Sequence, residues 1–159
     1  MENSKERSPD RDDEAPRIRD VVVGDGAAIK PLLDQLGYAL DVSEIERRIA
    51  RVAGAGGHCL VLAEDEAGIP MALLHVYGRE ALEKPPEAVV QALVVRDGLR
   101  GRGLGRAMMA RAEEWAAAQG YRHIALSSQT SRDGAHAFYQ GLGYALYATS
   151  HQFRKKIPS

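Results

Sequence analysis

The sequence predicts a mixed α/β (α+β) fold in one domain, in which a mostly antiparallel sheet of about six to seven strands is flanked by about four helices. Three observations predict it. Segments typical of strands are interspersed with segments whose apolar residues recur at helical spacing. HCLVLAED and IPMALLHVYG are strand-like and are joined by a short DEAG turn, which indicates an antiparallel hairpin. The chain has 159 residues, 45% apolar and 27% charged, which suits a globular protein with its own core.

The first half of the chain supplies a strand, two helices and the hairpin. RIRDVVV (17–23) predicts a strand, and GDGAAIKPLLDQLG (24–37) has leucines and an isoleucine at helical spacing before a terminal glycine, a natural helix stop. Either Asp41 or Ser43 can cap a second helix, which a glycine-rich segment then ends. The hairpin follows over residues 58–78.

The second half is expected to alternate between strands and helices. AVVQALVV (88–95) is almost unbroken in its apolar residues, which is typical of a strand buried on both faces. Residues 104–119 predict a helix with one apolar face, residues 123–129 (HIALSSQ) a strand, and AHAFYQGLG (135–143) a short helix. YALYATSHQFRKKI (144–157) is expected to supply one or two closing strands.

Composition and charge exclude several classes of protein. The net charge is −1 and the sequence pI is about 6.5, so nothing global indicates binding to nucleic acid or to an anionic membrane. Residues 1–16 are polar and are expected to form a flexible tail before the domain at residues 17–157; they do not resemble a signal peptide. Cys59 is the single cysteine and is expected to be a buried structural thiol. A cytoplasmic location is therefore predicted.

The stretch LRGRGLGRAMM (99–109) places three glycines and three arginines between a predicted strand and a predicted helix. The first N–H groups of a helix lack internal partners and attract anions, and glycines let backbone amides approach phosphate oxygens. Residues 96–106 contain four arginines against one aspartate, a local charge of +3 in a chain whose total is −1. A phosphate-bearing ligand is therefore predicted here, in preference to a surface turn with solvated arginines.

Two familiar phosphate-binding loops do not fit this stretch. A Walker loop needs Lys-Ser or Lys-Thr after its last glycine, where Leu104 stands. A dinucleotide-binding fingerprint that starts at Gly101 needs a sixth-position glycine where Arg106 stands, and it also needs an acidic residue at the end of the next strand, which closes on SSQ. NAD and ATP are therefore disfavoured.

The pattern Arg100-x-x-Gly103-x-Gly105 after a buried strand, joined to AHAFYQGLGY (135–144), resembles the GNAT superfamily of acyl-coenzyme A N-acyltransferases. The resemblance extends from about residue 17 to residue 157 through the order of elements. It implies an enzyme that uses acetyl-CoA as co-substrate without a metal, and a splayed strand pair that holds the coenzyme.

The resemblance also implies where the coenzyme lies. The glycine-rich loop would bind its pyrophosphate, the strand before the loop would pair with the pantetheine arm, and a backbone N–H near Val95 would polarise the thioester carbonyl. After the fifth strand, Ser128 and Gln129 replace an asparagine of many relatives, and Arg132 either reaches the coenzyme or caps the short helix. The implied coenzyme-binding residues are Leu93, Val94, Val95, Arg100, Gly101, Arg102, Gly103, Leu104, Gly105, Arg106, Ser128, Gln129 and Arg132.

The catalytic residues are likewise implied by the resemblance. Tyr139 on the short helix occupies the position of the family's general acid, which protonates the departing thiolate, whereas Phe138 is expected in the core. Gln91 cannot act as a base, although many members carry a carboxylate on this strand. His75, Glu87 and a water relay are the alternatives for the general base, and His75 is equally well explained as a hydrogen-bonded core histidine.

The acceptor is expected to be a primary amine of a small molecule. Its side of the site would come from residues 37–46 and 77–89, whose carboxylates either attract a cationic amine or form solvated faces. A peptide N-terminus or lysine, a non-catalytic acetyl-CoA-binding module and a nucleic-acid binder are the alternatives, the last disfavoured because the loop lacks aromatic residues for stacking. Homodimers are common among relatives, so a homodimer is an expected assembly.

Overall fold

The computed structural model describes residues 15–158, which divide into one compact unit that ends at Leu126 and a second that begins at Ser127. Each unit is described by itself. The predicted tail at residues 1–16 lies outside the described residues except for its last two.

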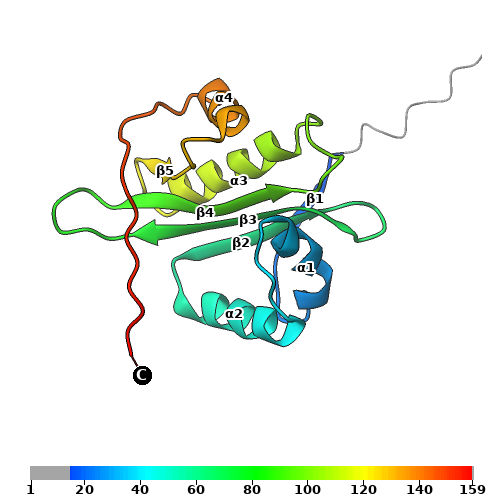
Figure 1. The fold of residues 1–159 in the computed structure, drawn as a ribbon. Coiled ribbons are helices and arrows are strands. Elements are labelled where there is room, and N and C mark those ends of the chain that lie inside the picture. The colour runs from blue at the N-terminus through cyan, green and yellow to red at the C-terminus, as the bar shows by residue number, and fades with distance from the viewer. Residues whose placement is uncertain (1–14, 159) are drawn as a thin grey trace, which may run out of the picture. The chain divides into compact units, whose positions relative to one another are not determined.

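The first unit is built on a five-stranded sheet whose strands lie in the order of the chain (Figure 1). Neighbouring strands are antiparallel as far as the fourth, and the fifth runs parallel to the fourth. This arrangement confirms the predicted mixed, mostly antiparallel sheet and its central hairpin. The strands are β1 (Arg17–Asp20), β2 (His58–Glu64), β3 (Pro70–Arg79), β4 (Glu87–Val95) and β5 (Ile124–Leu126).

Four helices occur among the described residues, as predicted. In the first unit α1 (Gly26–Gln35) and α2 (Val42–Ala55) lie on one face of the sheet and α3 (Leu104–Ala118) lies on the other, as Figure 1 shows. The second unit contains α4 (Asp133–Gly141). A glycine with positive φ follows α1 and α3 closely, at Gly37 and Gly120, so the predicted glycine stops are confirmed.

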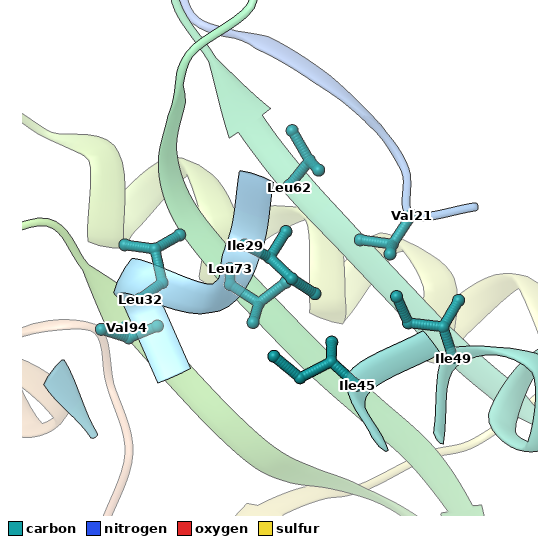
Figure 2. Packing of buried hydrophobic residues seen from close by; sticks show 8 residues of the cluster. All are labelled: Val21, Ile29, Leu32, Ile45, Ile49, Leu62, Leu73 and Val94. Atoms are coloured by element: carbon teal, nitrogen blue, oxygen red, sulfur yellow. The ribbon is translucent and has the colours of Figure 1, made fainter. Parts of the chain in front are cut away.

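Buried apolar side chains of α1, α2 and the sheet form a core on one face, shown in Figure 2. Leu32 of α1, Ile45 of α2 and Leu62 of β2 are at most 2% exposed. Burial of each such side chain contributes about 1.5–3 kcal/mol. On the other face Met108 and Met109 of α3 are at most 1% exposed. The sheet is thus held between two apolar layers.

The predicted closing strands at residues 144–157 are wrong, because residues 142–158 adopt no helix or strand. The sheet of the described residues therefore has five strands rather than six to seven. Leu146, Tyr147 and Phe153 are 76% exposed or more. An alternating apolar pattern predicts strand propensity, but a strand forms only where its N–H and C=O groups find a partner strand.

Two other predicted strands are shorter than expected. β1 stops at Asp20, because the Val22 N–H donates instead to the Asp25 carboxylate at 2.8 Å and the chain turns toward α1. β5 is confined to three residues, Ile124–Leu126. Cys59 is 6% exposed, which confirms the prediction of a buried thiol.

Candidate functional site

The glycine-rich loop of the first unit leads into α3 and leaves backbone amides free of helical partners. Gly101 and Gly103 have φ of 79° and 82°, a conformation that favours glycine. Gly103 is the N-cap of α3 and has no side chain to accept from the first turn; its C=O accepts from the Ala107 N–H at 2.9 Å. The N–H groups of the first turn, from Leu104 on, therefore have no acceptor within the helix. This is the geometry of an anion-binding helix start.

The positive charge of the arginines in the loop also favours an anion. Arg100 pairs with Asp97 at 3.2 Å, but both side chains are more than two-thirds exposed, so the pair contributes little to stability. Arg102 and Arg106 are exposed and form no ion pair with any described residue. The loop thus combines free amides with unpaired positive charge, as a bound pyrophosphate requires.

A β-bulge divides β4 at Gln91. His75 of β3 lies opposite Ala92, and the next residue, Val76, lies opposite Val90, so Gln91 is the extra residue. Its side chain is exposed, which corrects the expectation that β4 is buried on both faces. β5 pairs with Ala88, Val89 and Val90 only. From Gln91 onward, no strand among residues 15–158 lies along the outer edge of β4.

The backbone groups at this open edge can be assigned from the ladder. The Arg96 N–H donates to the Met71 C=O of the preceding hairpin strand at 2.8 Å. Since alternate residues of an antiparallel strand face the same neighbour, Val94 also faces β3, whereas Leu93 and Val95 direct their N–H and C=O groups to the open edge. Val94 places its side chain in the core and is 5% exposed. An extended group can therefore pair with Leu93 and Val95.

Gln35, the last residue of α1, reaches this strand end and has no counterpart among the sequence predictions. Its Nε2 donates to the Val95 C=O at 2.7 Å, and its Oε1 accepts from the Asp97 N–H at 2.9 Å. No motif in the sequence indicated the contact, because the partners lie some sixty residues apart in the chain.

His75 lies beside the bulge in a cluster of rings. Its Nε2 is 2.9 Å from Nδ1 of His58 on β2, and the ring of Tyr77 lies 5.6 Å from that of His58. In this pair one ring nitrogen donates and the other accepts. Burial, with a smaller contribution from the charge of His58, lowers the pKa of His75 to about 4. His75 is thus neutral at pH 7 and hydrogen-bonded, as the core alternative expected, and it retains a second ring nitrogen.

Glu87, the other predicted base, is held by two cations. Its carboxylate pairs with Arg79 across the hairpin and with Lys84 at 3.0 Å. Hydrogen bonds from Arg79 and, next, from Lys84 lower the pKa of Glu87 below its usual value. A carboxylate stabilised in its charged form is a poor proton acceptor.

The carboxylates of residues 37–46 are occupied within the chain. Asp41 caps α2 by accepting from the Glu44 N–H at 2.7 Å, and Glu44 pairs with Arg47 and Arg48 at 2.7 Å each. Glu46 accepts from the backbone N–H groups of residues 24 and 26 and so caps α1. These three carboxylates therefore stabilise helices rather than await a ligand.

The remaining predicted site residues lie in the second unit. Tyr139 is half-buried on α4, and its ring contacts those of Phe138 and Tyr144 at 5.1 and 6.0 Å between centroids. Phe138 is half-buried too, so the predicted core role of Phe138 is only partly met. Burial raises the pKa of Tyr139 above its usual value, and the charge of Arg132 acts in the opposite direction. The phenol is therefore protonated at neutral pH.

The segment before α4 contains an unused hydroxyl. The Ser128 Oγ is buried and has no hydrogen-bond partner in the described chain. The C=O of Gln129 accepts from the Arg132 N–H at 3.0 Å and lies 2.9 Å from Nε2 of His136, which orders the turn. The Arg132 side chain does not cap α4, which removes that alternative for it.

Other kinds of site receive no support from the described residues. Residues 15–158 contain no group of three or more His, Cys, Asp or Glu side chains that could hold a metal ion. None of the helices described is long and apolar enough to cross a membrane.

Comparison with known proteins agrees with this geometry. The sequence model described as "Acetyltransferase (GNAT) family" matches residues 32–144. The chain is 26% identical to the N-acetyltransferase YhdJ of Bacillus subtilis over 128 residues, which cover 80% of this chain and 88% of that protein. It is 35% identical to the N-alpha-acetyltransferase 80 of Mus musculus over 91 residues, which cover 55% of this chain but only 28% of that longer protein.

A solved structure shares the fold. The aminoglycoside N-acetyltransferase AAC(6')-Iy, in complex with a bisubstrate analogue of coenzyme A and acetylneamine, superposes with a TM-score of 0.80. The superposition covers 91% of this chain and all of that chain (100%), at 16% sequence identity.

Proposed function

Because the chain belongs to the GNAT acetyltransferase family and is an acetyl-CoA-dependent N-acetyltransferase, we propose that it acetylates a primary amine of a small molecule. The observation that carries this function is the meeting of two features in one unit. The free amides and arginines of the loop at residues 99–106 directly follow the open edge of β4. The coenzyme supplies an acetyl group activated as a thioester.

The loop and the strand edge take different parts of the coenzyme. The N–H groups of the first turn of α3, together with Arg102 and Arg106, bind the pyrophosphate. The outward-facing groups of Leu93 and the Val95 N–H pair with the pantetheine arm and the thioester carbonyl. In the second unit, the buried Ser128 hydroxyl is available for a further contact. The proposed coenzyme-binding residues are those named from the sequence, with the Leu104 and Val94 side chains serving the core instead.

Tyr139 is proposed as the general acid. Its raised pKa keeps the phenol protonated at neutral pH, so it has a proton to give to the departing thiolate. The conjugate thiol has a pKa of about 8.5, below that of the phenol, so proton transfer depends on a short, aligned approach. The charge of Arg132 lowers the pKa of the phenol and so brings it closer to that of the thiol, which assists proton transfer.

His75 is the better of the two base candidates. Glu87 is stabilised as a charged carboxylate by Arg79 and Lys84, whereas His75 is neutral at pH 7 and can accept a proton. Its hydrogen bond to His58 gives that proton a second imidazole to share. A pKa of about 4 makes His75 a weak base, so the amine is expected to bind largely as the free base.

The acceptor is proposed to carry few positive charges. Asp41, Glu44, Glu46 and Glu87 are all engaged by partners in the chain, which leaves only Glu80 and Glu83 of the two predicted acceptor segments to attract a cation. An amine with one or two basic groups fits this surface better than a polyamine. The likeness to a segment of the murine N-alpha-acetyltransferase 80 favours a peptide N-terminus as the second candidate.

A thiol-release assay with acetyl-CoA tests the function. Small monoamines, aminoglycosides and short peptides with a free N-terminus are compared at equal concentration. Turnover confined to monoamines supports the proposal, whereas turnover confined to peptides assigns the second candidate. Tyr139→Phe is expected to lower kcat by about ten-fold or more with little change in acetyl-CoA affinity, and Tyr147→Phe, in an exposed position, is the matched control. Unchanged kcat would remove Tyr139 from the mechanism.

Two predictions from the sequence remain: that the protein forms a homodimer and that it is located in the cytoplasm. Light scattering on the purified chain tests the first, and the two-fold difference in mass decides it.

A further inference from the structure

Gln35 joins α1 to both sides of the point where β4 ends. Its side-chain amide donates to the Val95 C=O at 2.7 Å and accepts from the Asp97 N–H at 2.9 Å. The carboxamide of glutamine carries a donor and an acceptor on one planar group, so it can bridge a C=O and an N–H at once. Both contacts are at normal hydrogen-bond distance, so the amide is fully directed by the backbone it bridges.

The bridge holds the turn that follows β4 at the edge of the strand that does not face β3. The Arg96 N–H donates to the Met71 C=O at 2.8 Å, and the Leu99 N–H donates to the Arg96 C=O at 3.0 Å. With Gln35 added, every backbone group from the Val95 C=O to the Asp97 N–H has a partner. β5 pairs only as far as Val90, so no strand among the described residues supplies the hydrogen bonds that Gln35 makes here.

One polar group at this strand end is left over. Val95 directs both its N–H and its C=O to the open edge, and Gln35 occupies the C=O. The Val95 N–H is therefore the last donor of the strand that faces the edge before the glycine-rich loop begins. The Val95 N–H belongs to the peptide plane that precedes Val95. That plane is joined at the Val95 Cα to the plane whose C=O Gln35 holds, so Gln35 restrains the direction of the N–H across one residue.

We propose that Gln35 is a positioning residue that holds the Val95 N–H toward the acyl carbonyl of bound acetyl-CoA, a role that rests on the proposed placement of the thioester at this edge. Gln35 itself touches no part of the coenzyme in this role. It orients a donor, as the supporting hydrogen bonds of a preorganised site do.

The test compares acetyl-CoA with free CoA, because only acetyl-CoA carries the carbonyl. Gln35→Met keeps the length of the side chain and removes both hydrogen bonds, and Gln119→Met, at the exposed end of α3, is the matched control. Dissociation constants of both ligands are measured by titration calorimetry. In Gln35→Met the constant for acetyl-CoA is expected to rise about ten-fold more than that for CoA, whereas Gln119→Met leaves both unchanged.

A merely structural role predicts a different pattern. If Gln35→Met weakens both ligands equally, or neither, the positioning role is overturned. If the wild-type chain binds neither ligand, the coenzyme placement fails, independently of Gln35. Should Gln35→Met not fold, hydrogen exchange of the wild-type Val95 amide decides: acetyl-CoA is expected to slow it more than CoA does, and equal protection by the two ligands overturns the role.

Discussion

The two halves of β4 have nearly the same composition but differ in how many neighbouring strands they pair with. The first half, up to Val90, pairs with β3 on one side and β5 on the other. Within the described part of the chain, the second half, from Gln91 to Val95, pairs with β3 alone. Both are rich in valine and alanine, so strand propensity does not distinguish them.

The bulge at Gln91 and the end of β5 make the difference. One extra residue changes which side chains and which N–H groups face outward, and β5 ends opposite Val90. The second half then presents unpaired backbone beside a loop that favours anions. Proteins usually avoid open strand edges, so an open edge that leads into a loop rich in glycine and arginine supports the proposed site for an extended ligand.

Proline substitutions are expected to break the two halves differently, with the largest effect in the paired half. The Val90 N–H faces β5, so Val90→Pro removes a ladder hydrogen bond and is expected to lower the free energy of unfolding by about 3 kcal/mol. The Leu93 N–H faces the open edge, so Leu93→Pro is expected to cost about 1 kcal/mol while weakening acetyl-CoA binding about ten-fold. Urea denaturation and titration calorimetry measure the two effects.

The control for the proline pair is Leu93→Ala, which shortens the same side chain but keeps the N–H. It is expected to bind acetyl-CoA more tightly than Leu93→Pro does. If Leu93→Pro destabilises the chain as much as Val90→Pro, the edge is not open and the contrast between the halves is wrong.

Local patterns predicted most of the fold because its elements are determined locally. The hairpin of β2 and β3 and the glycines after α1 and α3 follow from residues within a few positions of one another. Gln91 was visible in the sequence as a lone polar residue in an apolar strand, yet its effect on register depends on β3 and β5. The place of the glycine-rich loop at the start of α3 was predictable, because glycines and arginines adjacent in sequence remain adjacent in space. Its binding of an anion stays a prediction.

Features that depend on distant partners could not be predicted. The prediction of closing strands at residues 144–157 was wrong, because strand propensity does not by itself supply a partner strand. The preference for His75 over Glu87 needed the contacts of each: His58 for one, Arg79 and Lys84 for the other. Gln35 sits at the end of an ordinary amphipathic helix, and nothing local shows that its amide reaches β4.

The glycine-rich loop sharpens the comparison by testing what the open half leads into. Gly103 has positive φ, and an added Cβ would meet nothing within 4 Å, so Gly103→Val strains the backbone and fills the space a phosphate needs. Acetyl-CoA affinity is expected to fall about a hundred-fold, which calorimetry measures. Gly120→Val is the matched control, with φ of 86° and equally open space at the other end of α3.

Both glycine variants are expected to lose similar stability, because both force a branched side chain into a left-handed conformation. Only Gly103→Val is expected to lose the coenzyme. Normal binding by Gly103→Val would show that the loop does not hold it, and loss in both variants would show that strain alone accounts for the effect.

A smaller effect than that of Val90→Pro is expected beside the bulge, where His75 lies opposite Ala92. The pKa of His75 is about 4 in the folded chain against an unfolded value near 6.5, so the unfolded state binds more protons between these values. Stability is therefore expected to fall as pH decreases from 6.5 to 4, by about 2 kcal/mol, and to be unaffected by this group above pH 7. Below pH 4, protonation of Asp25 and Glu87, whose pKa values are lowered by Arg19 and Arg79, reduces the stability further.

Thermal unfolding of His75→Gln between pH 4 and 6.5 tests this assignment. The stability of the variant is expected to depend less on pH in this range than that of the wild type. An unchanged slope would mean that another group titrates there.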